Sequence, residues 1–359
     1  MRRLTAVVCA GALLCLSAWM FTSCEKEKYS PTPYEITIPR YFPTALNIPA
    51  DNPLTEEGIE LGEKLFHDPI ISGEPSEGLC CASCHVKSAG YDLGGDNPRL
   101  ENGRPRGAAG VTHHNALPLC NLVFNRQGYL WNGSVAGEKN IEDIVRTAIT
   151  LPEELNASED QVVAAISADA GYREMFRKAF GDEEVTMDRI SKAIAQYVRT
   201  LISAESKFDH YLRGEATLTD AELRGYILFT TEEGADCFHC HGSAGTPLFT
   251  TNLFYNNALT AHPEDPMDRF SVTGDEMDHG CYRAPTLRNI AVTAPYMHDG
   301  RFNTLDEVLD FYNSGLQSSP YASPLMHKLP DGGACLTPSQ IADLKAFLNT
   351  LTDEKFIQE

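Results

Sequence analysis

Two short segments carry the residue types best suited to chemistry. Each reads C-x-x-C-H, and together they comprise Cys81, Cys84 and His85, and Cys237, Cys240 and His241. Two cysteines at this spacing can each form a thioether bond to a haem vinyl group, and the next histidine can then bind the iron from one face. The sequence therefore predicts two covalently bound c-type haems, with His85 and His241 as iron ligands.

Zinc binding and thiol redox chemistry are the competing interpretations. Zinc modules usually hold their ligand pairs much closer in sequence than these two segments lie. A thioredoxin-type C-x-x-C pair needs no following histidine and belongs to a βαβ context, which this sequence does not suggest. The spacing argues against zinc, and thiol redox chemistry leaves the repeated histidine unexplained, so two haems are the favoured interpretation.

Helices are expected before each of the two segments, over residues 55–66 and 219–229. Apolar residues at three- and four-residue steps predict a further helix over 187–203, followed by a short helix or linker over 206–212. The last helix is expected over 338–351, because Thr337 and Gln340 can form a capping box around Pro338. Loops rich in Gly, Pro, Asn and Asp span 88–117 and 249–289, and loops of that length usually serve a site.

The fold class that follows is mainly α, with two cytochrome c-like haem domains whose long loops wrap the haems. Residues 51–205 would form the N-terminal domain and residues 206–359 the C-terminal domain. Residues 24–50 are polar and rich in proline, which is typical of a tether.

The N-terminus predicts export. Arg2 and Arg3 precede an apolar stretch and small residues before Cys24, which resembles a lipoprotein signal over residues 1–23. An uncleaved membrane helix is the alternative. Since c-type haem is attached outside the cytoplasm, we expect a periplasmic protein that meets the membrane only through a lipid on Cys24.

The net charge of −21 excludes one class of partner. Loss of residues 1–23 removes two arginines, leaving 27 basic against 50 acidic side chains and a net charge of −23. Such a surface argues against nucleic acid binding and suits a basic electron-donor protein steered by charge, although solubility alone would also explain it.

Cysteines outside the haem segments are available for disulfides in an oxidising compartment. After the signal segment and Cys24 are set aside, they are Cys80, Cys120, Cys281 and Cys335. Their connectivity cannot be deduced from sequence, and the pair Cys281–Cys335 is the one we expect.

Four further segments surround the haem segments in a distinctive order. They are residues 61–69 (LGEKLFHDP), 208–214 (FDHYLRG), 284–289 (APTLRN) and 293–301 (TAPYMHDGR). From about residue 55 to about residue 352 the chain thereby resembles the bacterial dihaem cytochrome c peroxidase family, including its MauG branch.

The resemblance implies unequal haems. In that family the N-terminal haem splits hydrogen peroxide and the C-terminal haem receives an electron, so His85 would serve the first and His241 the second. The family's catalytic glutamate falls on Glu154, in the segment 148–155, with Glu153 as the alternative. A carboxylate there would move a proton between the peroxide oxygens. From the residues alone, both acids read as solvated groups at a helix start.

The resemblance also assigns Trp131 and a calcium ion. Trp131 matches a tryptophan that relays electrons between the haems, although a single tryptophan is more often a packed core residue. The family binds calcium between the haems through carbonyl oxygens, at positions that match Asn115, Thr293 and Pro295.

The sequence offers three candidates for the second axial ligand of the C-terminal haem. The well-studied peroxidases have methionine fourteen residues after the histidine of the 293–301 segment, and here that position is Tyr312. Tyrosine resembles the MauG branch, and as an anionic donor it should lower the haem potential. Met326 is the alternative, and Met297 comes after it. We favour Tyr312.

Three departures from the family pattern carry weight. The family's Trp-Asp-Gly-Arg string is Trp131-Asn132-Gly133-Ser134 here, and its Arg-Asn pair is His114-Asn115. The distal histidine of peroxidases that need reductive activation has no counterpart in residues 103–107. The first haem is therefore expected to be open in the resting enzyme, unless His113 or His114 reaches it.

The function expected is an exported peroxidase that reduces hydrogen peroxide with electrons from a small donor protein, a cytochrome c or a cupredoxin. A MauG-like oxidation of another protein's side chains and a non-enzymatic dihaem electron carrier are the alternatives. A homodimer is also compatible with the resemblance.

Overall fold

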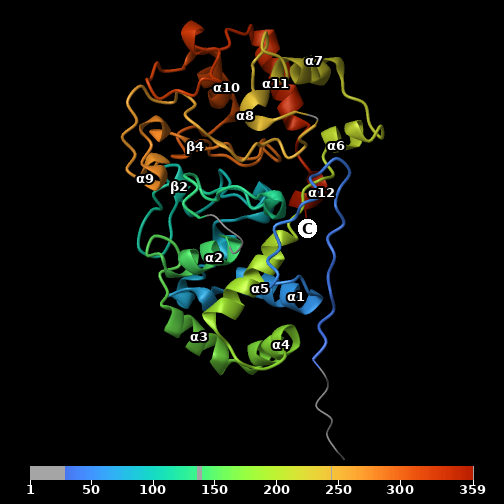
Figure 1. The fold of residues 1–359 in the computed structure, drawn as a ribbon, viewed down its shortest axis with the longest axis vertical. Coiled ribbons are helices and arrows are strands. Elements are labelled where there is room, and N and C mark those ends of the chain that lie inside the picture. Colours follow the sequence, from blue (N-terminus) through green and yellow to red (C-terminus); the bar gives the residue numbers. More distant parts are fainter. Residues whose placement is uncertain (1–28, 136–139, 244, 359) are drawn as a thin grey trace, which may run out of the picture.

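Two helix-rich halves lie one above the other along the long axis of the molecule (Figure 1). The computed structural model describes residues 29–135, 140–243 and 245–358. The predicted signal over residues 1–23 and its lipidation site Cys24 lie outside this description. Within these ranges, no helix has the length and apolar character needed to cross a membrane.

The N-terminal half is built from helices around one core. Leu61, Phe66, Ile149, Phe176 and Ile190 are among its fully buried side chains. The helices are α1 (Glu56–His67), α2 (Asn140–Thr150), α3 (Glu159–Ala168), α4 (Ala170–Phe180) and α5 (Met187–Arg199), and an antiparallel pair of short strands, β1 (Leu100–Glu101) and β2 (Arg104–Pro105), lies in the loop after the first haem segment.

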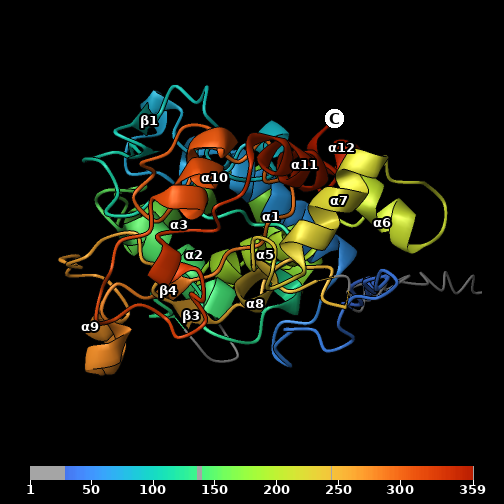
Figure 2. The same cartoon turned by 90° about the horizontal axis from the view of Figure 1, so that it is seen from above.

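The C-terminal half has its own aromatic core, centred on Phe208, Phe229, Phe249 and Phe347. Figure 2 shows its helices overlying those of the first half. The elements are α6 (Lys207–Leu212), α7 (Asp220–Phe229), α8 (Phe238–His241), α9 (Phe270–Thr273), α10 (Leu305–Ser314), α11 (Pro338–Asn349) and α12 (Glu354–Ile357), with the antiparallel strands β3 (Phe254–Tyr255) and β4 (Tyr282–Arg283). The prediction of a mainly α fold with two cytochrome c-like domains is confirmed.

Each half repeats one close helix pairing. A Cβ atom on Gly62 of α1 would lie 1.9 Å from the Ala193 carbonyl oxygen on α5. A Cβ atom on Gly225 of α7 would lie 1.9 Å from the Asp343 carbonyl oxygen on α11. The missing side chain lets each pair of backbones touch, and in both halves the helix that carries the glycine precedes the haem segment.

The predicted helices occur near their expected bounds. Thr55 and Thr219 cap α1 and α7, and Thr337 forms the expected capping box with Gln340 on α11. The helix α5 ends at Arg199 rather than 203, and the Ser203 amide donates to the Asn121 side chain instead of continuing the helix. The helices α2, α3, α4 and α10 were not predicted, nor were the short helices α8, α9 and α12.

Residues 29–50 lie against both halves. Phe42 is buried with Val123, Phe124 and Leu248, and its ring receives the Arg288 guanidinium at 4.9 Å. The described part of the predicted tether therefore contributes to a small core of its own.

The predicted disulfide Cys281–Cys335 is wrong, because both thiols are free. Cys281 is buried and its sulfur donates to the Met277 carbonyl, whereas Cys335 is exposed and its sulfur donates to Asp331. The two side chains are therefore held in separate local turns.

Candidate haem sites

The first haem segment begins with a 3-10 turn over Cys81–Ser83. The chain then reverses at Gly90 and Tyr91, which have φ values of +67° and +59°. This reversal brings the Tyr91 carbonyl oxygen to 3.0 Å from Nδ1 of His85. With Nδ1 donating to a carbonyl, Nε2 keeps its lone pair for a metal, and burial lowers the pKa of His85 so that the ring stays neutral.

The second haem segment is held in the same way by a different part of the chain. His241 ends α8, and its Nδ1 lies 3.2 Å from the Pro285 carbonyl oxygen in the 284–289 segment. Burial lowers the pKa of His241 to about 4. Both histidines thus present a neutral ring with a fixed tautomer.

A cavity of about 200 Å³ opens beside Cys237, Cys240 and His241. Most of its lining is apolar, with Phe229, Leu287, Ile290, Tyr296, Leu309 and Leu348 among the side chains. Two thiols, one neutral imidazole and an apolar wall are the groups that a covalently attached haem needs. The residues present therefore fit this cofactor.

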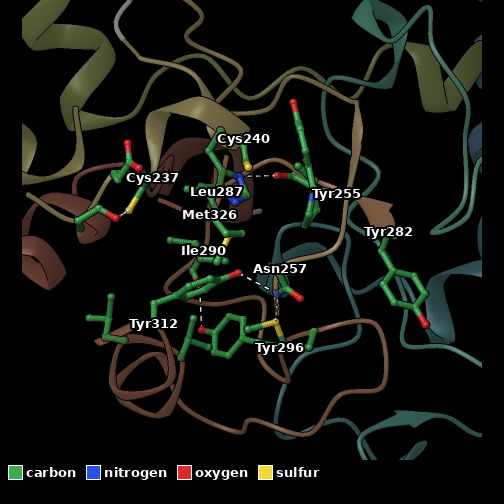
Figure 3. A pocket seen from close by; sticks show the side chains of 18 of the residues that line it. Cys237, Cys240, Tyr255, Asn257, Tyr282, Leu287, Ile290, Tyr296, Tyr312 and Met326 are labelled. Atoms are coloured by element: carbon green, nitrogen blue, oxygen red, sulfur yellow. Dashed lines mark hydrogen bonds between the residues drawn. The ribbon is translucent and has the colours of Figure 1, made fainter. Parts of the chain in front are cut away.

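Tyr312 reaches the same cavity from α10 (Figure 3). Its hydroxyl oxygen accepts a hydrogen bond from Asn257 Nδ2 at 3.0 Å, and the same amide lies 3.8 Å from the Met297 sulfur. Burial raises the pKa of the Tyr312 phenol, and the Asn257 donor opposes this rise. Met326 also lines the cavity, so all three candidate ligands meet there.

Trp131 borders this cavity from the N-terminal half. Its indole Nε1 donates to the Asn115 carbonyl at 2.8 Å, and its own carbonyl accepts from the Arg283 amide at 2.7 Å. The rings of Tyr282 and His298 lie edge-on to it, with centroids at 6.5 and 6.4 Å. Trp131 is therefore both a packed residue and a neighbour of the second haem segment.

Glu154 lies in the turn after α2, beside the first haem segment. Burial raises the pKa of the Cys81 and Cys84 thiols, and the nearby charge of Glu154 adds to that rise. Burial, followed by the charge of Glu153, raises the pKa of Glu154 to about 7. The Glu154 backbone carbonyl accepts a hydrogen bond from the Ala108 amide at 2.8 Å. The long loop that contains Ala108 therefore holds this turn in place.

Asn115 and Pro295, two of the three calcium positions, are in direct contact. Asn115 Nδ2 donates to the Pro295 carbonyl at 2.7 Å, and the Asn115 amide donates to the His298 carbonyl at 2.7 Å. Thr293 is buried close by in the chain. The calcium site itself remains a prediction.

His113 and His114 are both bound to the carboxylate of Asp265 from the second half, at 2.6 and 2.7 Å. In this structure neither histidine is directed to the first haem segment. The glycine-bearing loop at 103–107 instead packs on Gly300, where a Cβ atom on Gly103 would lie 2.2 Å from the Gly300 carbonyl oxygen.

Several functional neighbours escaped the sequence interpretation. Tyr91 and Pro285 hold the two histidines through their backbone carbonyls, and a pattern of side chains does not predict such contacts. Asn257 and Asp265 lie in a long loop, and each meets a residue far away in sequence. The best available signal was the length of that loop, which indicates a site without naming its residues.

Comparison with known proteins identifies the family. Residues 56–217 match the family model described as di-haem cytochrome c peroxidase. The methylamine utilization protein MauG of Methylorubrum extorquens is 33% identical over 314 residues, which cover 87% of this chain and 83% of that protein. The chain belongs to the di-haem cytochrome c peroxidase family. It is a peroxidase-type oxidoreductase with two c-type haems.

Two other family relatives agree with this assignment. The cytochrome c551 peroxidase of Nitrosomonas europaea is 34% identical over 266 residues, or 73% of this chain and 75% of that protein. The crystal structure of a MauG-like protein associated with microbial copper homeostasis superposes with a TM-score of 0.80 at 35% identity. It covers 91% of this chain and 97% of that one. A buried ion pair between Arg288 and Asp209 joins the segments 284–289 and 208–214, two of those on which the family resemblance rests.

Proposed function

We propose that this chain is an exported peroxidase whose two haem segments have different roles. The segment with His85 reacts with hydrogen peroxide, and the segment with His241 receives electrons from a small donor protein and passes them on. The observation that supports this division best is a carboxyl group, Glu154, buried beside the first pair of cysteines. The second pair has a phenol, Tyr312, in its cavity instead.

When bound, each haem supplies an iron that exchanges electrons, and the first also offers peroxide a binding position. The protein supplies the proton handling. With a pKa of about 7, Glu154 can take a proton from hydrogen peroxide and return it to the oxygen that leaves as water. Among the described residues, no hydrogen bond to its carboxylate competes for that proton.

His85 and His241 orient the two sites. Each donates Nδ1–H to a backbone carbonyl, which keeps the ring neutral and fixes which nitrogen faces the haem. Trp131 couples the sites through its contacts with Asn115 on one side and Arg283 on the other. Tyr312 is the proposed second ligand at the C-terminal haem, with Asn257 holding its oxygen.

A second candidate function is peroxide-driven oxidation of another protein's side chains. Tyr312 favours it, because the family members that have methionine at this position are the peroxidases with small donor proteins. The 33% identity to a MauG protein supports the same alternative.

Several finer features belong to the same proposal. Residues 51–205 and 206–359 form the two haem domains, and residues 24–50 connect the first of them to a lipid on Cys24 in the periplasm. A calcium ion is bound by Asn115, Thr293 and Pro295. The donor is a cytochrome c or a cupredoxin, attracted by the net charge of −23 (27 basic against 50 acidic side chains) that remains without residues 1–23. Two copies of the chain form a homodimer.

The test is oxidation of a reduced cytochrome c by hydrogen peroxide, catalysed by the full haem-loaded protein. Glu154→Gln should lower kcat by about 10²-fold or more, whereas Glu153→Gln, its matched control, should keep most of the activity. Peroxide that alters the haem spectrum without consuming donor would favour the second candidate. A protein that does not react with peroxide would contradict both.

A further inference from the structure

Three metal-binding side chains meet away from the haem segments. One ring nitrogen each of His113 and His114 and one carboxylate oxygen of Asp265 lie within 4.8 Å of one another. His113 and His114 are in the long loop of the first half, and Asp265 is in the long loop of the second half. The cluster therefore bridges the two halves.

Hydrogen bonds hold the Asp265 carboxylate in a fixed orientation, as is usual for a metal ligand. One carboxylate oxygen accepts from His113 at 2.6 Å and from the Met267 amide at 2.9 Å. The other accepts from His114 at 2.7 Å and from the Tyr282 hydroxyl at 2.6 Å. Ligating carboxylates are usually fixed by such outer hydrogen bonds, which the Tyr282 hydroxyl and the Met267 amide supply here.

The nitrogen and oxygen atoms of the cluster could bind a small cation if they moved slightly apart. Metal–nitrogen and metal–oxygen bonds of about 2.0–2.2 Å place neighbouring ligand atoms about 3 Å apart, slightly more than the 2.6 and 2.7 Å observed. Each imidazole would exchange the hydrogen that it shares with Asp265 for a bond to the metal, its proton moving to Nδ1.

The cluster is also accessible. The His113 side chain is 41% exposed, whereas those of His114 and Asp265 are 13% and 15% exposed. A cation can therefore arrive from solvent beside His113 and complete its coordination with water.

We propose that His113, His114 and Asp265 form a binding site for a divalent first-row transition metal, with Cu²⁺ bound most tightly. Two imidazoles and one carboxylate are a donor set for zinc, copper, iron or nickel, and Cu²⁺ heads the affinity order of such sites. Calcium prefers six to eight oxygen ligands, so two imidazole nitrogens disfavour it here.

The site is distinct from the predicted calcium position, although Asn115 adjoins His114. It lies next to the aromatic residues beside the second haem cavity, since the His114 ring is 5.8 Å from Tyr282 and 5.7 Å from His298. A bound cation would tie the two long loops together and stabilise their contact.

The experiment uses the ferric haem-loaded protein, first treated with a chelator and then dialysed against Cu²⁺ or Zn²⁺ in the presence of excess Ca²⁺. Metal analysis should give one Cu²⁺ per chain beyond the haem iron. The nitrogen couplings of the copper resonance spectrum should come from two imidazoles. His113→Ala and Asp265→Asn should each weaken Cu²⁺ binding at least about tenfold.

His262→Ala is the matched control, because His262 is an exposed histidine in the same loop as Asp265. It should bind Cu²⁺ like the unmodified protein. Retention of copper by both His113→Ala and Asp265→Asn at the unmodified level would overturn the proposal, as would an unmodified protein that retains no copper. Unchanged haem spectra of the variants would show that they are folded.

Discussion

His85 and His241 each donate through Nδ1 to a backbone carbonyl, at 3.0 and 3.2 Å, yet their neighbours differ. Glu154 lies by the first segment, and Tyr312 and Met326 line the cavity of the second. The electrostatic environment therefore distinguishes two segments that are identical in their motif.

The pH dependence of peroxide reduction should report Glu154. Burial and then the charge of Glu153 raise its pKa to about 7, and only the ionised carboxylate can accept a proton. The rate should therefore rise with pH through about 7 in the unmodified protein. Glu153→Gln removes the like charge, so the rise should move to lower pH. If the rate of Glu153→Gln rose over the same pH range as that of the unmodified protein, this assignment would be contradicted.

Tyr312 should determine the spectrum of the second haem. The oxidised protein should lack the methionine–iron absorption band at about 695 nm. Tyr312→Phe should change the low-spin signal of that haem, whereas Met326→Leu, the control, should leave it unchanged. A band at about 695 nm that persists in Tyr312→Phe and vanishes in Met326→Leu would make Met326 the ligand.

Single residues were predictable where a local motif names them. Cys81, Cys84 and His85 follow from spacing alone, because thioether attachment and ligation need neighbouring residues. Glu154 and Tyr312 required a resemblance, since each reads locally as an ordinary acid or aromatic residue. Asn257 gave no signal, because its partner lies 55 positions away.

At the scale of elements, one helix pair recurs in each half. The helices α1 and α7 carry Gly62 and Gly225 at the point where α5 and α11 press against them. Since α1 and α7 lead into the two haem segments, this contact sets the position of each segment relative to its core.

Filling either glycine position should destabilise the protein. A new Cβ would lie 1.9 Å from a carbonyl oxygen, so the helices must move apart, at a cost of about 1–3 kcal/mol. Gly62→Ala and Gly225→Ala should therefore both lower the thermal unfolding midpoint. Gly245→Ala, where nothing lies within 4 Å, should not. An unchanged midpoint for both helix variants would refute the close contact.

Helices that begin after a capping threonine could be predicted from sequence, as α1, α7 and α11 illustrate. Their starts were accurate because a threonine side chain caps a backbone amide next to it. The end of α5 was predicted less accurately, because it depends on tertiary contacts of residues 200–205.

At the scale of the whole molecule, the C-terminal segment joins the halves. One oxygen of Asp353 accepts from Ser203 Oγ at 3.1 Å and from the amides of Ala204 and Glu205 at 2.8 and 2.9 Å. Phe356 then packs on Tyr91, with ring centroids 5.4 Å apart. The second half thus reaches the residue whose carbonyl holds His85.

Removal of the Asp353 carboxylate should weaken this junction. Asp353→Ala would leave three donors without their acceptor, two of them buried, which costs about 1–3 kcal/mol. The denaturant midpoint should fall, whereas Glu354→Gln, on the exposed side of the same turn, should behave like the unmodified protein. Equal midpoints for the two variants would show that the junction is not held by Asp353.

Contacts between the halves lay beyond sequence reasoning. His113 and Asp265 are 152 positions apart, and Ser203 and Asp353 are 150 apart. Neither pair belongs to a periodic pattern or a motif, so only the folded chain shows that they meet. The mainly α class was predictable, because it depends on local helices and on the repeated haem segment.

The most direct test of unequal haems is the electron paramagnetic resonance spectrum of the ferric protein, before and after one equivalent of hydrogen peroxide. An open first haem and a second haem held by His241 and Tyr312 predict one high-spin and one low-spin signal, both of which peroxide should alter. Two low-spin signals that remain unchanged after peroxide would contradict the account.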